Sequence, residues 1–270
     1  MSRFLDVAVE AVQEAGAFLK ESVGRVRSVE TKKGEVRNLV SEIDRGAEQR
    51  IIRIIHGHFP GHAILAEESG EGQARSDVRW IIDPLDGTTN FLHGVPIFST
   101  TVGIEENGVL VAGATYDPNL NELYTAERGS GAFCNGTRLH VTPTDALINA
   151  LIVTGFPYDI GENPDHPAEH FVNFLYEARG VRRLGSAALD LAWVAAGRFD
   201  GFWEVSLSPW DMAAGVLLVH EAGGSTSDFT GAPTTIYRRQ ILATNGRIHN
   251  PAVAILQKAY REKSSGTISG

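Results

Sequence analysis

The chain has 270 residues, 43% hydrophobic and 8% aromatic, which is typical of a globular protein with one large or two modest domains. Its net charge of −9, without a long basic run, argues against general nucleic-acid or anionic-membrane binding and suits an acidic pocket that binds cations. Cys134 is the single cysteine, which excludes an internal disulfide, and no apolar stretch approaches the roughly 20 residues that span a bilayer.

Two helices are predicted at the start of the chain. Apolar residues recur at i, i+3, i+4 and i+7 through residues 4–19, which predicts an amphipathic helix. Glu10 and Glu14 interrupt this segment, so we do not expect a signal peptide and we expect a cytoplasmic protein. A second helix is predicted over residues 42–58, before the Pro/Gly break at 60–61. We expect the two helices to pack as a pair.

The next part of the chain has the alternating pattern of strands. Turn residues that tolerate a positive φ, at 107–108 and 135–136, predict hairpins and an antiparallel sheet resting on the helix pair. The strands are predicted at residues 63–66, 79–82, 98–104, 109–116 and 122–126.

Strand and helix patterns alternate after about residue 145, which predicts a second sheet flanked by helices. Asn250 and Pro251 are typical of the N-cap and first position of a last helix. Strands are predicted at 150–154, 181–184, 201–205 and 241–244, and helices near 166–178, 186–196 and 210–222. We therefore expect an N-terminal half at 1–145, a C-terminal half at 146–262 with a seam near 143–147, and a disordered tail at 263–270.

The run WIIDPLDGTTNF at residues 80–91 carries most of the chemical information. Its apolar start predicts a buried strand that Pro84 ends, so Asp83 and Asp86 would lie at the strand's carboxyl end. Carboxylates at this spacing, with the Leu85 carbonyl between them, suit Mg²⁺. The N–H groups of residues 87–89 suit the start of a short helix that receives phosphate. The two aspartates alone would fit a polar turn equally well, but the whole run favours a phosphatase centre.

Two further carboxylate motifs lie at the edges of predicted elements. Glu67 and Glu68 follow a predicted strand, and alone they would also fit a solvated loop; we assign Glu67 to metal and leave Glu68 as a supporting or solvent-facing residue. Asp211 lies near a helix start, where alone it would also fit an N-cap. One shared metal site explains the three motifs most simply.

Five segments together resemble the inositol monophosphatases, a family of Mg²⁺-dependent, lithium-sensitive phosphatases, and the match is closest to the bacterial branch. A dehalogenase-type phosphatase also has paired aspartates, but at i, i+2, whereas Asp83 and Asp86 lie at i, i+3. The wider spacing favours a metal-activated water over a phospho-aspartate. The segments are 39–44, 66–69, 80–91, 185–188 and 210–224.

The resemblance implies an α/β (α+β) fold, a layered αβαβα sandwich, and a magnesium-dependent hydrolase. It implies that Thr88 pairs with Asp44 and that both, with Glu67, orient the attacking water as catalytic residues. Two or three Mg²⁺ ions would be bound by Glu67, Asp83, Leu85, Asp86 and Asp211. Substrate contacts would come from Asp86, Gly87, Thr88, Ala187, Glu204 and Asp211. A departure from the family pattern is Asn38, which stands where the family commonly has aspartate.

The predicted substrate is a small phosphorylated polyol or sugar, and the resemblance favours inositol 1-phosphate. Glu204, which by the resemblance binds sugar hydroxyls, offers a bidentate acceptor for adjacent hydroxyls that suits this compound and the alternatives alike. Fructose 1,6-bisphosphate, glycerol 2-phosphate, histidinol phosphate and nucleotide 2′- or 3′-phosphates remain alternatives. We expect a homodimer, as is usual in the family, and neither a nucleic-acid nor a membrane partner. A regulatory binding protein with secondary phosphatase activity is the alternative of another class. His56, His58 and His62 are expected in loop or surface roles.

Overall fold

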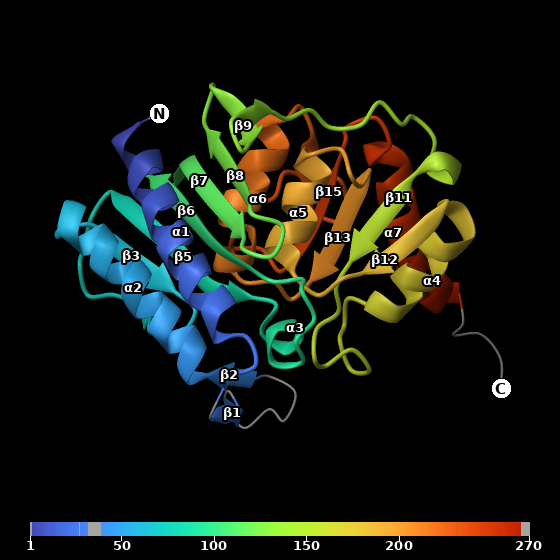
Figure 1. Cartoon of the computed structure of the whole chain (residues 1–270). Helices are drawn as coiled ribbons and strands as arrows, with labels where there is room; N and C mark the ends of the chain where they lie inside the picture. The colour runs from blue at the N-terminus through green and yellow to red at the C-terminus, as the bar shows by residue number, and fades with distance from the viewer. Residues whose placement is uncertain (1, 27, 32–38, 266–270) are drawn as a thin grey trace.

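Helices and sheets alternate in five layers in the protein, for which we obtained a computed structural model that describes residues 2–26, 28–31 and 39–265. Two helices cover one face of a large sheet, two lie between this sheet and a smaller one, and two cover the outer face of the smaller sheet (Figure 1). The predicted αβαβα sandwich is confirmed. Asn38 lies outside the described residues.

The first layer is the helix pair α1 (Arg3–Ser22) and α2 (Glu42–His58). The hydroxyl of Ser2 accepts a hydrogen bond from the N–H of Leu5 and caps α1. The apolar stripe of α1, including Ala8 and Val12, is fully buried against α2 and the first sheet. Both helices lie where the periodicity predicts them.

The first sheet is largely antiparallel and has the strand order β10-β9-β8-β7-β6-β5-β3-β4. At its hairpins, Asn107 and Asn135 have φ of 51° and 47°, as the turn residues predict. Its strands are β3 (Ala63–Ala66), β4 (Gly70–Glu71), β5 (Val78–Asp86), β6 (Ser99–Glu106), β7 (Val109–Asp117), β8 (Glu122–Glu127), β9 (Gly131–Cys134) and β10 (Thr137–Arg138). A separate pair, β1 (Val29–Thr31) and β2 (Leu39–Ser41), precedes α2.

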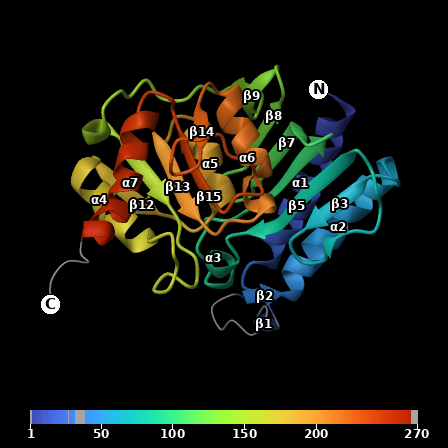
Figure 2. The ribbon, with the colours of Figure 1, turned by 180° about the vertical axis from the view of Figure 1, so that it is seen from behind.

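The second sheet has the order β12-β11-β13-β15-β14, with β12, β11 and β13 parallel. Figure 2 shows it from behind, with β15 beside the layer that holds α5 and α6. Its strands are β11 (Leu151–Thr154), β12 (Gly180–Arg183), β13 (Gly201–Val205), β14 (Ser225–Ser227) and β15 (Gln240–Thr244). The outer helices are α4 (Pro167–Glu177) and α7 (His249–Ser265).

The central layer consists of α5 (Ala187–Ala195) and α6 (Pro209–Glu221), which are apolar around nearly their whole circumference. Such helices are stable only when both faces are covered. Ile81 and Tyr124 of the first sheet belong to the same hydrophobic core as residues of α5 and α6 and Phe202 of β13 in the second sheet. The core thus continues across both halves.

Two elements, β5 and the last helix, extend beyond the predicted limits. β5 continues to Asp86, although its pairing with β6 is interrupted between Asp83 and Asp86, where Pro84 has no N–H to donate. The last helix begins at His249, ahead of the predicted N-cap Asn250, and extends to Ser265, three residues into the segment predicted to be disordered. Residues 266–270 lie outside the description.

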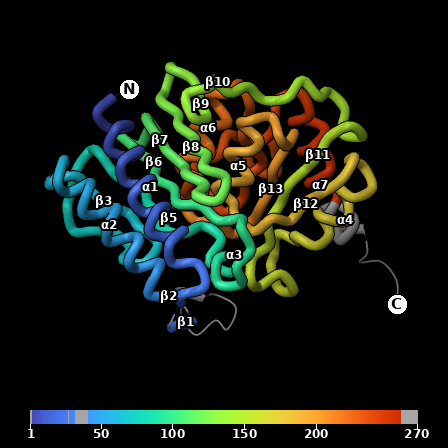
Figure 3. The backbone as a smooth tube through the Cα atoms, viewed as in Figure 1, coloured from blue at the N-terminus to red at the C-terminus, as the bar shows by residue number. Residues whose placement is uncertain are grey.

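No helix among the described residues is long and apolar enough to cross a membrane. The short helix α3 (Thr88–Leu92) lies between the two halves, at the end of the molecule where β5 stops (Figure 3). The functional residues gather at this junction.

Candidate metal and phosphate site

Strand ends and helix starts meet in a pocket of about 1050 Å³ between the two sheets. β5 ends at Asp86, α3 begins directly after it, and α6 begins just before Asp211. Glu204 lies near the end of β13 and enters the same pocket. Of the residues singled out from the sequence, the lining contains Glu67, Asp83, Leu85, Asp86, Gly87, Thr88, Ala187, Glu204 and Asp211. Asp44 is fully buried and is not part of the lining.

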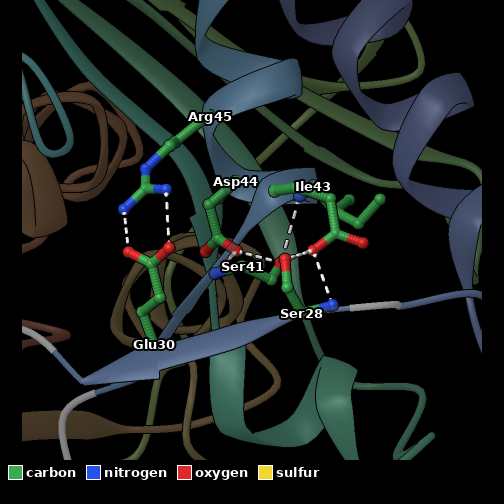
Figure 4. Close-up of polar contacts among 7 residues, drawn as sticks. Ser28, Glu30, Ser41, Ile43, Asp44 and Arg45 are labelled. Carbon is green, nitrogen blue, oxygen red and sulfur yellow. Dashed lines mark hydrogen bonds and ion pairs between the residues drawn. The ribbon is translucent and has the colours of Figure 1, made fainter.

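Asp44 lies behind Thr88 and is held by the start of α2. As the third residue of the helix, it accepts hydrogen bonds through Oδ2 from the backbone N–H of Ser41 at 2.9 Å and from its hydroxyl at 2.6 Å (Figure 4). The hydroxyl of Ser41 accepts in turn from the N–H of Ile43 at 3.1 Å, completing a capping box. The other oxygen, Oδ1, accepts a 3.0 Å hydrogen bond from Thr88 Oγ1. The helix cap therefore orients Asp44 toward Thr88.

Asp211 occupies the equivalent position in α6. Oδ2 of Asp211 accepts from the N–H of Ser208 at 2.7 Å, and the two residues form a second capping box. Asp211 is thus the third residue of its helix rather than its N-cap, and it also lines the pocket. Ala213 and Ala214, which follow, are almost completely buried and bring α6 close to the first sheet.

The two aspartates of β5 are fixed by hydrogen bonds to different elements. Oδ2 of Asp86 accepts from the hydroxyl of Ser186 and, at 2.8 Å, from the N–H of Ala188 at the start of α5. Oδ1 of Asp83 accepts from the N–H of Leu85 at 3.0 Å. Ser186 lies 100 residues from Asp86 in the sequence, so the central helix layer positions this carboxylate.

Gly87 turns the chain from β5 into α3. Its φ of 93° lies in the left-handed region, which glycine adopts without a steric penalty. A Cβ there would also meet the carbonyl oxygens of Ile97 and Gly185 at 3.0 and 3.2 Å. The first N–H groups of a helix have no intrahelical acceptor. The start of α3 beside Asp86 therefore suits an anion, as the sequence predicts.

Glu67 follows β3, and the loop it begins is held from α2. The N–H of the next residue, Glu68, donates a 2.8 Å hydrogen bond to Oε2 of Glu48, and the N–H of Glu67 donates to the carbonyl of Ile82. Glu48 is 4% exposed. The Glu67 side chain lines the pocket, and Glu68 does not.

Burial and mutual repulsion make the carboxylates of the pocket hard to ionise. Burial, followed by the charges of Glu67, Asp86 and Asp211, raises the pKa of Asp83 well above its usual value. Burial and the charges of Glu67 and Asp86 do the same for the pKa of Asp211. The pKa of Asp86 is raised by burial to about 6, although the hydrogen bond from Ser186 opposes the rise. A cation between these groups would relieve the repulsion.

The donors present fit divalent magnesium. They are carboxylate and carbonyl oxygens, the hard ligands that Mg²⁺ prefers. Within the described residues, no three His, Cys, Asp or Glu side chains are arranged to hold a metal ion by themselves. Mg²⁺ commonly keeps several waters and takes only one or two carboxylates, which suits such an open arrangement. Asp83, Asp86 and Asp211 therefore fit a site that water and substrate complete.

Glu204 forms the opposite wall of the pocket, and Gly155 makes room for it. A Cβ on Gly155 would overlap the Glu204 carboxylate. Burial raises the pKa of Glu204 to about 8, while the charge of Arg183 opposes the rise. Asp190 on α5 lies nearby; it is buried, and burial followed by the charge of Glu204 raises its pKa as well.

Sequence reasoning did not assign a role to several residues of the site. Glu48 holds the loop that begins at Glu67, and the hydroxyl of Ser186 donates to the Asp86 carboxylate. Arg183, Ser206 and Arg239 line the pocket. Ser186 lies inside a motif already recognised, so its hydroxyl beside Ala187 was an available signal. Arg239 precedes a short strand in a segment without a motif, and only the strand order of the second sheet brings it to the pocket.

The three histidines near the end of α2 lie away from this pocket. His56 and His58 are exposed, and Nδ1 of His62 accepts a 3.0 Å hydrogen bond from Trp80 Nε1 while its ring stacks on Phe59 at 4.6 Å. His56 and His58 are thus at the surface and His62 lies in the loop between α2 and β3, which agrees with the predicted loop or surface roles. His62 is also partly buried and packs against Phe59.

Comparisons of the sequence and of the structure with known proteins all point to one protein family. The sequence profile of the Inositol monophosphatase family matches residues 1–262. The Inositol-1-monophosphatase of Mesorhizobium japonicum is 44% identical over 266 residues, covering 95% of this chain and 97% of that protein. The Nus factor SuhB of Pseudomonas aeruginosa is 42% identical over 262 residues, covering 95% and 97%. The solved structure of inositol monophosphatase from Anabaena (Nostoc) sp. has a TM-score of 0.86 at 42% identity, covering 94% of this chain and 95% of that one.

Proposed function

We propose that this chain, which belongs to the inositol monophosphatase family, hydrolyses inositol 1-phosphate with Mg²⁺ as cofactor. The observation that carries the proposal is the meeting of buried, mutually repelling carboxylates with the Thr88–Asp44 pair and Glu204 around one pocket. The relatives named inositol-1-monophosphatase support the substrate.

The chain's own residues would bind the ester and orient a water molecule. Bound Mg²⁺ would supply positive charge to the phosphoryl oxygens and acidify the attacking water. Glu67, Asp83, Asp86, Asp211 and the Leu85 carbonyl would hold the ions. Because Thr88 Oγ1 donates its hydrogen to a neighbouring acceptor, its lone pairs stay available to accept a hydrogen bond from the attacking water and to orient that water toward phosphorus. The N–H groups of Gly87 and Thr88 would take the phosphate oxygens.

The alcohol portion of the substrate would face Glu204 and Ala187 across the pocket. A carboxylate of Glu204 can accept hydrogen bonds from two adjacent hydroxyls, which suits inositol. The same contacts suit fructose 1,6-bisphosphate, glycerol 2-phosphate, histidinol phosphate and nucleotide 2′- or 3′-phosphates. Relative kcat/KM for phosphate release from this panel, with and without Mg²⁺, tests the proposal. No Mg²⁺-dependent release from any compound would contradict it.

A regulatory binding role is the second candidate. Several relatives with about the same identity, among them the proteins of Pseudomonas aeruginosa and Escherichia coli, are named Nus factor SuhB rather than phosphatase. A deletion strain complemented with Asp83→Asn separates the candidates. Rescue of the phenotype by this variant favours regulation, and failure of rescue alongside success of the wild type favours catalysis.

We also propose a homodimer. Val172, Leu175 and Tyr176 lie at i, i+3 and i+4 on α4 and are 46%, 50% and 81% exposed, which is unusual for an apolar stripe. A second copy would cover them. Sedimentation of the wild type and of Leu175→Glu tests the proposal, since a dimer through this face would dissociate in the variant.

A further inference from the structure

Two basic side chains line a pocket that is otherwise rich in acids. Among its described lining residues, Arg183 and Arg239 are the basic ones, and the acids include Asp159 and Glu204. Metal ions would compensate the carboxylates around Asp83, but they do not account for cationic groups on the opposite wall. Arg183 lowers the pKa of the neighbouring Glu204 and so offsets part of its charge, whereas the hydrogen bond of Arg239 goes to a neutral hydroxyl. Arg239 therefore needs another explanation.

Arg239 is held in place by a residue with an unusual backbone conformation. Its Nη2 donates a 2.7 Å hydrogen bond to Oγ of Ser206, and the N–H of Ser206 donates to the carbonyl of Arg239 at 2.6 Å. Ser206 has a φ of 64°, in the left-handed region that non-glycine residues rarely adopt. Strained residues of this kind concentrate at functional sites.

A second hydrogen bond keeps Ser206 in position. Nδ2 of Asn163, which is 4% exposed, donates to Oγ of Ser206 at 2.9 Å and to Oδ1 of Asp159 at 2.9 Å. The hydroxyl oxygen of Ser206 thus accepts from both Asn163 and Arg239. These hydrogen bonds hold the guanidinium group of Arg239 in place before any ligand binds. Less side-chain entropy is therefore lost when a ligand binds to it.

The strand register places the two arginines on either side of Glu204. Gln240 pairs with Val205, so Arg239 lies opposite Ser206, at the end of β13 that carries Glu204. Arg183 ends β12, two strands away on the other side, and Nη1 of Arg183 is the atom that a Cβ on Gly185 would meet first. Both cations are therefore at the wall that we assign to the alcohol portion of the substrate.

We propose that Arg239 is a specificity-determining residue that binds a second anionic group on the alcohol portion of the substrate, with Arg183 adding positive charge on the far side of Glu204. The group is a phosphate or a carboxylate, since a guanidinium pairs with either in the same planar geometry. The inference rests on the proposed phosphatase function and, among its candidate substrates, favours phosphate monoesters that carry a second anionic group within reach of Arg239.

Matched substrates test the inference on the full chain with Mg²⁺. Fructose 1-phosphate and fructose 1,6-bisphosphate share one phosphate ester and differ in the second, and glycerol 2-phosphate and 2-phosphoglycerate differ by a carboxylate. For at least one pair, we expect the wild type to have a higher kcat/KM for the member with the second anionic group. The pair that shows this preference identifies that group as phosphate or carboxylate. Loss of a charge-assisted hydrogen bond in Arg239→Gln should raise KM for that member by about tenfold or more and leave its partner within about twofold.

Two further variants keep the test informative. Arg238→Gln removes the neighbouring arginine, which does not line the pocket, and should leave every KM unchanged. Ser206→Gly removes the hydroxyl that holds Arg239 while tolerating the positive φ, and should lower the selectivity in the same direction as Arg239→Gln.

Equal losses for both members of each pair in Arg239→Gln would overturn the inference, as would a wild type without preference for either doubly anionic compound. Both results would leave the proposed function standing, because phosphate is still released. Absence of Mg²⁺-dependent release from all four compounds and from inositol 1-phosphate would overturn both proposals together.

Discussion

The hydroxyl of Thr88 lies 3.0 Å from Oδ1 of Asp44, although the two residues are 44 positions apart in the sequence. The capping box of α2 aims Asp44 at this hydroxyl, and Thr88 itself lines the pocket. A helix cap and the start of a second helix thus combine to give a single polar group a defined orientation.

Replacement of Thr88 tests this pair. Thr88→Val keeps the volume but removes the hydroxyl, so we expect kcat to fall by about 10²-fold or more, because misplacing a reacting group by about 1 Å costs roughly this factor. The measurement is steady-state phosphate release from inositol 1-phosphate. Thr88→Ser retains the hydroxyl and should keep kcat within about tenfold of the wild type. Similar kcat values in both variants would contradict the orienting role.

Neutral analogues of the metal carboxylates should separate activity from folding. Asp83→Asn and Asp211→Asn should abolish Mg²⁺-dependent phosphate release, and each should raise the Tm of the metal-free protein because a buried repulsion is removed. Thermal unfolding with and without MgCl₂ checks this, since bound ligand stabilises the wild type by about 2.7 kcal/mol at a hundredfold excess over Kd. Asp145→Asn, at an exposed aspartate, is the control. Retained turnover in both variants would refute the metal assignment.

The raised pKa of Glu204 predicts a pH dependence of stability. Its pKa is about 8 in the folded protein and 4.5 in the absence of burial, so the folded state binds the proton more tightly. The free energy of unfolding of the metal-free protein should therefore fall as the pH rises from about 4.5 to about 8. Urea unfolding of the wild type and Glu204→Gln measures this contribution. The variant should lose stability less steeply over that range, and parallel curves would contradict the prediction.

Gly155 offers a test of the opposite wall. The Cβ of Gly155→Ala would displace the Glu204 carboxylate, so we expect KM for inositol 1-phosphate to rise and the free energy of unfolding to fall by about 1–3 kcal/mol, as in overpacked cores. Gly161→Ala in the same loop has open space around its Cβ and should change neither value. Equal kinetics in the two variants would argue against Glu204 as a substrate contact.

Lithium inhibition is expected from membership of the family. Li⁺ carries half the charge of Mg²⁺, so in the carboxylate site it would stabilise the phosphoryl charge less. Turnover measured against increasing LiCl at fixed MgCl₂ should decline, with KCl at equal ionic strength as the control. An unchanged rate would count against lithium sensitivity while leaving the phosphatase proposal intact.

The secondary structure followed closely from local patterns. Helical periodicity located α1 and α2, and the turn residues Asn107 and Asn135 located two hairpins. Predictions that depended on one or two residues were less accurate. The Asn250–Pro251 pair predicted a helix start at Asn250, but α7 begins at His249. Pro84 likewise interrupts the pairing of β5 with β6 without ending the strand.

The sequence by itself determined which residues can provide metal, phosphate and hydroxyl contacts, because side-chain chemistry and short-range periodicity depend only on the residue and its neighbours along the chain. Only the tertiary structure decided how these residues are oriented and charged. Ser186 reaches Asp86 across 100 residues, and Arg239 reaches the pocket through the order of the strands. The raised pKa values have the same origin, since like charges repel strongly only after folding has removed the water between them.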